Sequence, residues 1–246
     1  MVEKVMSLVR TGLALCVVLV FCLARMTLPW RAVERFGWAL VLRLFRVSLT
    51  VHGQPAKGGV LMLANHVSWI DIAALGRASD ACFVAKSEVG TWPVIGPAAR
   101  CMGCLFVDRG SRRSAQMIAA QIGTRLTGGR NVIVFPEGTT GPGDGALPFR
   151  STLTGATTIK PLTVQPVTLV YRSAGDRALA AWLGDASLLP HALALARSGG
   201  ITLEIWFEQP FAAPDRKAAA SWAEAVVAGR LARELDGQAA TLKRVA

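Results

Sequence analysis

Short apolar runs alternate with longer helical segments along this chain, and that alternation constrains its fold more than any other feature. Runs typical of buried strands occupy residues 47–52, 60–64, 82–85, 105–107, 131–135, 162–170 and 201–207. Helices are expected at residues 30–46, 69–75, 111–127 and 217–238. Strands that alternate with helices predict an α/β fold, in which a largely parallel central sheet is flanked by helices on both faces.

The polar segment after the second run contains the strongest candidate for proton transfer. Of the three histidines in the chain, only His66 has a carboxylate a few residues downstream, at Asp71. On one continuous helix these two residues would lie roughly 140° apart, so they can meet only if His66 precedes a helix that begins near Asp71, with Ser68 as its N-cap. Asp71 would then orient the imidazole, whose other nitrogen can accept a proton near neutral pH. The alternative is a capped helix start with an incidental histidine.

A second polar segment follows another strand-like run. Residues 136–140, with the sequence Pro-Glu-Gly-Thr-Thr, come directly after the run at 131–135. In open α/β sheets, ligands bind outside the carboxyl ends of the strands. Because residues 65–66 also stand at a strand end, both segments are expected at one ligand-binding edge of the sheet.

Taken together, these segments resemble the glycerolipid acyltransferase family, which includes the 1-acylglycerol-3-phosphate acyltransferases. Over roughly residues 50–210 the family's patterns appear in order as Asn65-His66 with Asp71, Lys86, Pro93-Val94-Ile95-Gly96, Val107-Asp108-Arg109, Phe135-Pro136-Glu137-Gly138-Thr139 and the weaker Gln165-Pro166-Val167. The resemblance implies transfer of a fatty acyl group from an acyl thioester to a lysophospholipid hydroxyl in membrane lipid biosynthesis. The donor would be acyl-CoA or an acyl carrier protein, and no cofactor or metal is expected.

The resemblance also implies roles for individual residues. His66 would be the general base and Asp71 would fix its tautomer. The substrate-binding residues would be Asn65, Lys86, Arg109, Glu137, Gly138, Thr139 and Arg150. Lys86 and Arg109 would hold an anionic group, while Glu137 would pair with Arg109 or Arg150. Because none of the matched residues is an obvious covalent nucleophile, direct attack by the acceptor hydroxyl is expected.

One position departs from the family's pattern. The family usually has an arginine after Phe-Pro-Glu-Gly-Thr, and this chain has Thr140 instead. A bidentate donor for a phosphate is therefore missing there. Either Arg150 substitutes for it, or the acceptor lacks a phosphomonoester, as in the branch of the family that acylates lyso-ornithine lipid. Both acceptors, lysophosphatidate and lyso-ornithine lipid, remain open.

The charge of the chain predicts an anionic partner. The net charge is +11 and hydrophobic residues make up 52% of the chain. Such a composition suits nucleic acid or a phospholipid surface, and no segment resembles a nucleic-acid-binding module. The five cysteines include one Cys-x-x-Cys pair, Cys101 and Cys104, without a second pair or a histidine to complete a metal site. Reduced thiols facing the cytoplasm are expected.

The first part of the chain predicts attachment to a membrane. Residues 11–24 are nearly all apolar and are flanked by Arg10 and Arg25. A straight span needs about 20 residues, so an uncleaved anchor that spans or half-inserts is expected. A cleaved signal peptide is the alternative, but no small-x-small cleavage site follows.

A second helix at residues 30–46 is expected to lie in the interface. Four arginines share one side of this helix and apolar residues share the other: Arg31, Arg35, Arg43 and Arg46 form the basic side. Such a helix suits a membrane surface, and the alternative is a helix packed on its own domain. The expected organisation is a membrane-attachment helix pair at residues 1–46 and an acyltransferase domain at 47–246. The basic bias favours the cytoplasmic face of the inner membrane.

Two further hypotheses compete with a membrane-attached lysolipid O-acyltransferase. One is a thioesterase-like hydrolase, in which the same base acts on water. The other is a non-catalytic lipid-binding protein on the membrane surface. A separate question concerns residues 187–196, which are apolar and could form either core or a second membrane-facing patch.

Overall fold

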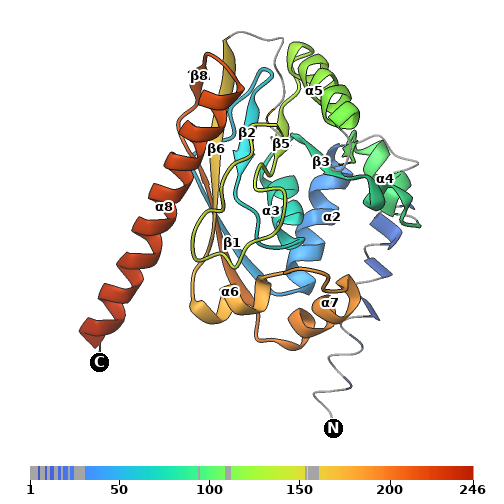
Figure 1. Ribbon diagram of the computed structural model, residues 1–246. Helices are drawn as coiled ribbons and strands as arrows, with labels where there is room; N and C mark the ends of the chain where they lie inside the picture. The colour runs from blue at the N-terminus through green and yellow to red at the C-terminus, as the bar shows by residue number, and fades with distance from the viewer. Residues whose placement is uncertain are drawn as a thin grey trace.

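The structure is a computed structural model. It describes residues 5, 9, 12–13, 16–17, 19–21, 23–24, 31–93, 95–108, 112–152, 154 and 161–245. One sheet of eight strands forms the centre of the molecule, in the order β1-β7-β6-β2-β5-β3-β4 with β8 beside β6 (Figure 1). The strands are β1 Val47–His52, β2 Leu61–Ala64, β3 Cys82–Lys86, β4 Leu105–Val107, β5 Val132–Val134, β6 Leu162–Tyr171, β7 Ile201–Phe207 and β8 Phe211–Ala213.

Most neighbouring strands are parallel. β2 runs parallel to β5 and β6, β3 runs parallel to β5 and β4, and β1 runs parallel to β7. Only β7 and β8 are antiparallel to their neighbour β6. The predicted α/β fold with a largely parallel sheet is therefore confirmed. In consequence, the carboxyl ends of β2, β5 and β6 meet at one edge, where the polar segments were expected.

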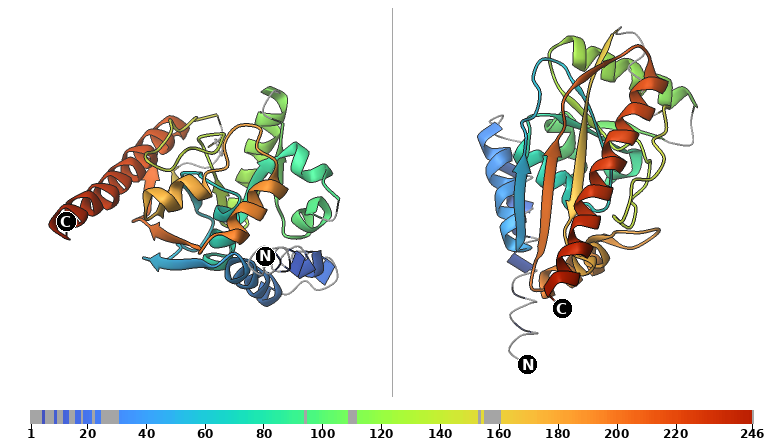
Figure 2. Two further views of the ribbon diagram at one scale, coloured as in Figure 1. Left: turned by 90° about the horizontal axis from the view of Figure 1, so that it is seen from below. Right: turned by 90° about the vertical axis from the view of Figure 1, so that its left-hand side faces the viewer.

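Helices cover both faces of the sheet (Figures 1 and 2). They are α2 Arg31–Leu44, α3 Ile70–Ala78, α4 Ile95–Cys101, α5 Arg112–Thr127, α6 Ala174–Ala180, α7 Leu188–Arg197 and α8 Arg216–Val245, with a short 3-10 helix η1 at Ser87–Thr91. α2, α3, α6 and α7 contribute to the core on one face, and α5 and α8 contribute to the core on the other. The sheet is thus the middle of three layers.

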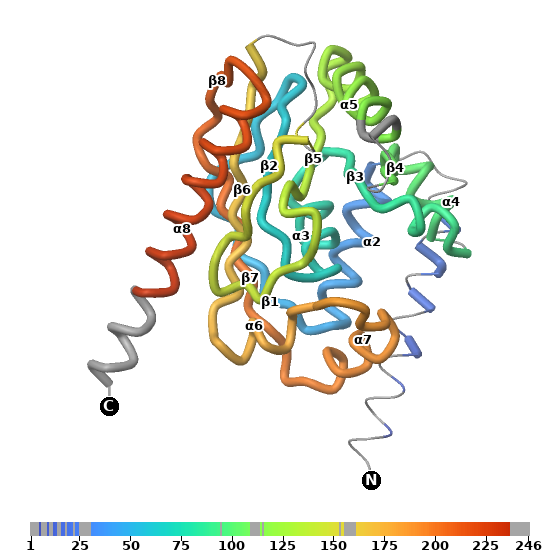
Figure 3. The backbone as a smooth tube through the Cα atoms, in the orientation of Figure 1, coloured from blue at the N-terminus to red at the C-terminus, as the bar shows by residue number. Residues whose placement is uncertain are grey.

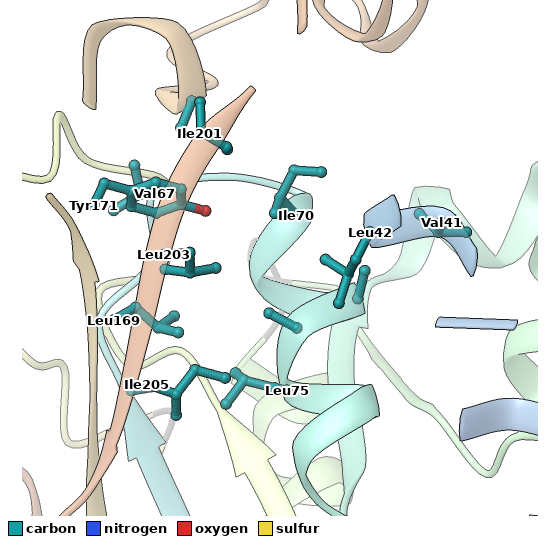
Figure 4. Packing of buried hydrophobic residues seen from close by; sticks show 14 of the residues in the cluster. Val41, Leu42, Val67, Ile70, Leu75, Leu169, Tyr171, Ile201, Leu203 and Ile205 are labelled. Carbon is teal, nitrogen blue, oxygen red and sulfur yellow. The ribbon is translucent and has the colours of Figure 1, made fainter. Parts of the chain in front are cut away.

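The two cores follow from the alternation of side chains along each strand. On one face Leu169, Leu203 and Ile205 meet Ile70 and Leu75 of α3 (Figure 4). Val170 and the partly buried Trp206, which alternate with these residues along β6 and β7, pack in the other core with α5 and α8. The central strand β2 is buried at all four positions, as expected for a strand covered on both faces.

The helix α2 is packed against its own domain. Val41 and Leu42 belong to the core, and a Cβ added at Gly76 of α3 would lie only 2.4 Å from Nε1 of Trp38. The outer side of α2 nevertheless carries Phe36, which is 71% exposed. The inner face of α2 thus packs on the domain, which was the alternative to a helix lying in the membrane interface.

The predicted anchor is described at only part of its length. The described residues among 5–24 are helical, and Phe21 lies edge-on to Trp38 of α2, with ring centroids 5.1 Å apart. Arg10, Arg25 and residues 29–30, on which the prediction also rested, lie outside the described residues. Within the part of the chain that the structure describes, no helix has the length and apolarity needed to cross a bilayer.

Some elements differ from the sequence-based expectation. Residues 92–97 were expected to be a loop, but α4 begins at Ile95. The helix can include Pro97 because this residue lies in the first turn, where no backbone N–H is needed for a helical hydrogen bond. β1 is followed directly by β2 in the chain, yet it lies at the far edge beside β7. The helix α6 and the strand β8 were not anticipated, although Ser173 and Asp176 form a capping box at the start of α6.

Candidate active site

The turn between β2 and α3 brings His66 and Asp71 together. β2 ends at Ala64 and α3 begins at Ile70, so His66 precedes the helix and Asp71 lies in its first turn. Nδ1 of His66 lies 2.8 Å from Oδ2 of Asp71. Because a carboxylate can only accept, Nδ1 carries the proton and Nε2 presents a lone pair. The predicted contact between the two side chains is present.

The carboxylate of Asp71 also organises the turn. Its Oδ2 accepts hydrogen bonds from the backbone N–H groups of Val67, at 2.7 Å, and Ser68, at 2.9 Å. The prediction that Ser68 caps the helix is wrong, because the N-cap residue is Trp69 and it makes no side-chain capping bond. The N–H groups that precede the helix are satisfied from within its first turn by Asp71, which is fully buried.

A tyrosine that the sequence did not single out completes the surroundings of Asp71. The hydroxyl of Tyr171, at the end of β6, donates to Oδ1 of Asp71 at 2.5 Å. Burial raises the pKa of Tyr171 well above its usual value, and the adjacent Asp71 raises it further. The hydroxyl therefore remains a donor throughout the physiological pH range. Tyr171 is the single tyrosine of the chain, and its place at the end of an apolar strand was the signal available in the sequence.

The imidazole of His66 is held on its flat side as well. Its ring stacks on Phe135, with centroids 3.9 Å apart and planes 15° from parallel. The His66 side chain keeps 14% exposure, and its Nε2 has no hydrogen-bond partner among the residues that the structure describes. One nitrogen is thus fixed by Asp71, and the other is available to a substrate hydroxyl.

Glu137 binds the backbone rather than an arginine. Its Oε2 accepts from the N–H of His66 and its Oε1 from the N–H of Leu147, each at 3.0 Å. Burial raises the pKa of Glu137 to about 8, against the opposing effect of these two hydrogen bonds. The expected ion pair with Arg150 is not formed, because Arg150 is exposed and both oxygens of Glu137 are occupied. Arg109, the other expected partner, lies outside the described residues.

Two further segments are bonded to the backbone at His66 and Val67. The N–H of Gly141 donates to the carbonyl of His66 at 2.7 Å, and the N–H of Trp182 donates to the carbonyl of Val67 at 2.9 Å. These segments are also joined to each other, because the hydroxyl of Thr140 donates to the carbonyl of Trp182. The loop after β5, drawn in yellow-green, passes in front of the sheet in Figure 3.

The remaining predicted site residues lie in different environments. Asn65 is buried, and its amide exchanges two hydrogen bonds with the backbone of Leu169, which joins the end of β2 to β6. Gly138 has a φ of +75° in the turn after β5, and Thr139 is exposed. Lys86 is exposed at the end of β3, with β5 between β3 and β2.

These positions separate residues that shape the site from residues that could contact a substrate. The side chains of Asn65 and Glu137 form hydrogen bonds with the backbone, so their observed contacts are structural. Lys86, Thr139 and Arg150 are exposed, so they are accessible to a substrate. No group of three metal-ligating side chains occurs in the described part of the chain.

The comparison with known proteins identifies the family. Residues 48–170 match the family model described as Acyltransferase. The lyso-ornithine lipid O-acyltransferase of Rhizobium meliloti is 35% identical over 217 residues, which are 82% of this chain and 74% of that protein. The chain belongs to the acyltransferase family. It is therefore an enzyme of acyl transfer, and the resemblance seen in the sequence is confirmed.

Other acyltransferases extend the comparison. The lyso-ornithine lipid O-acyltransferase of Brucella abortus is 34% identical over 226 residues, 85% of each chain. The 1-acyl-sn-glycerol-3-phosphate acyltransferase of Neisseria meningitidis is 41% identical over 126 residues, 50% of this chain and 49% of that one. The crystal structure of the 1-acyl-sn-glycerophosphate acyltransferase of Thermotoga maritima superposes with a TM-score of 0.65 at 19% identity, covering 94% and 97% of the two chains, and it shows the same fold.

Proposed function

We propose that this acyltransferase is a lysolipid O-acyltransferase with His66 as its general base. The observation that carries the proposal is the orientation of the imidazole, with Nδ1–H bonded to Asp71 and Nε2 left for a hydroxyl. Direct attack by the acceptor is proposed, because Ser68, the hydroxyl between His66 and Asp71 in the sequence, is fully buried. The relative from Rhizobium meliloti is named a lyso-ornithine lipid O-acyltransferase, and the one from Neisseria meningitidis a 1-acyl-sn-glycerol-3-phosphate acyltransferase.

The chemistry follows from this orientation. Nε2 of His66 takes the proton from the acceptor hydroxyl as its oxygen attacks the carbonyl carbon of an acyl thioester. The tetrahedral intermediate collapses, the carbon–sulfur bond breaks, and the imidazolium returns the proton to the leaving thiolate. Asp71 stabilises the imidazolium while it exists. General base catalysis of this kind contributes typically about 10²–10⁴-fold, and positioning supplies the remainder.

Lyso-ornithine lipid is the acceptor that the observations favour over lysophosphatidate. Relatives with that name match over 82% and 85% of this chain, whereas the Neisseria meningitidis relative matches over 50%. The side chain of Thr140 is bonded to Trp182 and offers no cation to a phosphate. Lys86, Arg109 and Arg150 are proposed to contact the carboxylate of the acceptor, and the donor is proposed to be a thioester of coenzyme A or of acyl carrier protein.

The enzyme is proposed to act at the cytoplasmic face of the inner membrane, without a cofactor. The N-terminal helical residues that are described include several exposed apolar side chains: Val5, Val9, Leu13, Leu19, Val20 and Leu23. On α2, Phe36, Arg35 and Arg43 are all exposed. Apolar and cationic side chains together suit an anionic phospholipid surface.

A competition assay tests the proposal. Purified protein in detergent receives a radiolabelled acyl thioester together with equal amounts of lyso-ornithine lipid and lysophosphatidate. We expect O-acylated ornithine lipid as the main product and little product from the His66→Ala variant. Release of free fatty acid without an acylated lipid would identify a thioesterase instead. Binding of lipid with no turnover would identify a lipid-binding protein.

A further inference from the structure

The outer side of α7 is apolar although it faces solvent. Leu189 is 51% exposed, and Leu183, in the segment before the helix, is 46% exposed. The inner side of α7 is buried in the core through Ala192, Leu195 and Ala196. A helix at the surface of a globular protein normally carries charged residues on its outer side. Between Leu188 and Arg197 the single charged residue is Arg197. One side of α7 is therefore buried and the other exposed, yet both sides are largely apolar.

The helix α7 is attached directly to the candidate active site. Nε1 of Trp69, at the start of α3, donates to Nδ1 of His191 in α7 at 3.0 Å. The segment before α7 donates a backbone hydrogen bond from Trp182 to Val67, the residue after the proposed base. Whatever contacts the outer side of α7 is therefore held close to His66.

Exposed apolar and basic side chains favour a lipid layer as the partner. The loop after α7 meets the end of α2, where the N–H of Ile201 donates to the carbonyl of Arg46. Arg46 and Arg197 are both exposed, and the helix itself has no acidic residue. Asp185, in the segment before α7, is exposed and is the one acidic residue of positions 181–200. Exposed apolar side chains accompanied by a net excess of arginines suit an anionic phospholipid layer. The described N-terminal pieces extend toward the same lower end of the molecule as α7 (Figures 1 and 2).

We infer that the outer side of α7, together with Leu183, is a second lipid-contacting surface that seats the active site on the membrane. This inference rests on the lysolipid acceptor proposed above. A lysolipid whose chain stays in the phospholipid layer while its hydroxyl reaches His66 need not pass through water. By contacting the layer, α7 would hold His66 at a fixed distance from the membrane surface. The open question about residues 187–196 is thereby answered for both sides of the helix: one side is core and the other faces lipid.

The test compares two equally exposed apolar positions on the full-length protein. Leu189→Glu introduces a charge on α7, and Met117→Glu introduces the same charge on α5, where Met117 is 55% exposed. α5 lies at the upper end of the molecule in Figure 1, opposite to α7. Flotation with vesicles of mixed zwitterionic and anionic phospholipid measures binding. Acylation of the same lysolipid class is measured with a long-chain acceptor in vesicles and with a short-chain monomeric acceptor.

We expect Leu189→Glu to weaken vesicle partitioning by about tenfold and to lower the ratio of vesicle to monomer activity by a similar factor. Met117→Glu should leave both measurements at the wild-type value. Equal flotation of Leu189→Glu and wild type would overturn the inference. So would an equal loss of activity on both forms of acceptor, which would indicate a protein donor at α7 instead. If wild type acylates no lysolipid, the proposed function fails, yet flotation still decides the role of α7.

Discussion

The N–H of His66 donates to Oε2 of Glu137 at 3.0 Å across 71 residues of sequence. The turn after β2, which carries His66, and the turn after β5, which carries Glu137, are therefore joined by a hydrogen bond. Glu137 positions His66 by binding its backbone N–H, while Asp71 orients the imidazole by binding Nδ1. This division between the two carboxylates leads to separate predictions for each.

Loss of the imidazole should remove most of the activity. For His66→Ala we expect the rate of acyl transfer to fall by about 10²–10⁴-fold, with the far-ultraviolet circular dichroism unchanged, because the side chain is partly exposed. His52→Ala is the matched control, since His52 lies on the edge strand β1 and bonds to Glu204 there. Activity of His66→Ala within tenfold of wild type would contradict the assignment of the base.

The hydroxyl of Tyr171 should matter through Asp71. Tyr171→Phe removes the donor to Oδ1 and leaves the ring in the core. Because the lost bond is to a charged group, we expect the free energy of unfolding to fall by about 1.5–3 kcal/mol. We also expect kcat to fall while KM stays unchanged, since Tyr171 contacts the orienting carboxylate and not the acceptor. An increase in KM at constant kcat would show instead that the hydroxyl acts on substrate binding.

Glu137 should make stability depend on pH in the alkaline direction. Its folded pKa of about 8 lies above the value of about 4.3 for an exposed glutamate. The folded state therefore holds the proton more tightly, and the contribution of this group is complete below about pH 4. It is lost as the pH rises through about 8.

Urea unfolding at several pH values between neutral and alkaline checks this expectation. The stability of wild type should decrease relative to that of Glu137→Gln as the pH rises, because the glutamine does not ionise. Glu88→Gln, at an exposed position of η1, is the control and should run parallel to wild type. Parallel curves for Glu137→Gln as well would mean that Glu137 ionises in the folded state as easily as in water.

The residue after the Glu-Gly-Thr segment should influence the choice of acceptor. Thr140→Arg removes the hydrogen bond to Trp182 and adds a cation near the ammonium of an ornithine headgroup. We expect kcat/KM for lyso-ornithine lipid to fall, by up to about tenfold for the bond alone, and the value for lysophosphatidate to rise. Thr140→Val removes the hydroxyl without the charge and separates the two effects. Unchanged rates on both acceptors would place Thr140 away from the headgroup.

The position of α2 sets how much of the N-terminus can be removed. Deletion of residues 1–46 would take Val41, Leu42 and Phe45 out of the core, each worth about 1.5–3 kcal/mol of burial. That loss approaches the whole stability of a typical domain. We expect a protein lacking residues 1–30 to fold and to float poorly with vesicles, and one lacking 1–46 to be recovered unfolded. Soluble, cooperative unfolding of the shorter protein would contradict the packing of α2.

Local sequence patterns predicted much of the fold and part of the candidate active site. β1, β4 and β7 begin and end where the apolar runs do, and the contact between His66 and Asp71 follows from the turn between a strand and a helix. Tyr171 was missed altogether, and Glu137 was expected at the site but with an arginine as its partner; they lie 100 and 71 residues from Asp71 and His66. Such pairs depend on strand order, which apolar periodicity does not encode. The same reason explains why the sequence does not predict the pairing of β1 with β7.

That position of β1 has a consequence for synthesis on the ribosome. Val47 pairs with Ile201, so the first strand of the sheet is made well before the strand it must join. At about 5–20 residues per second, the interval lasts on the order of ten to thirty seconds. Throughout it residues 47–52, which follow the apolar N-terminal segment, lack the strand with which they pair in the folded protein. Early capture of that segment by a bilayer would keep growing chains apart on its surface, so that membrane delivery during translation would protect this enzyme from aggregation before it ever meets a substrate.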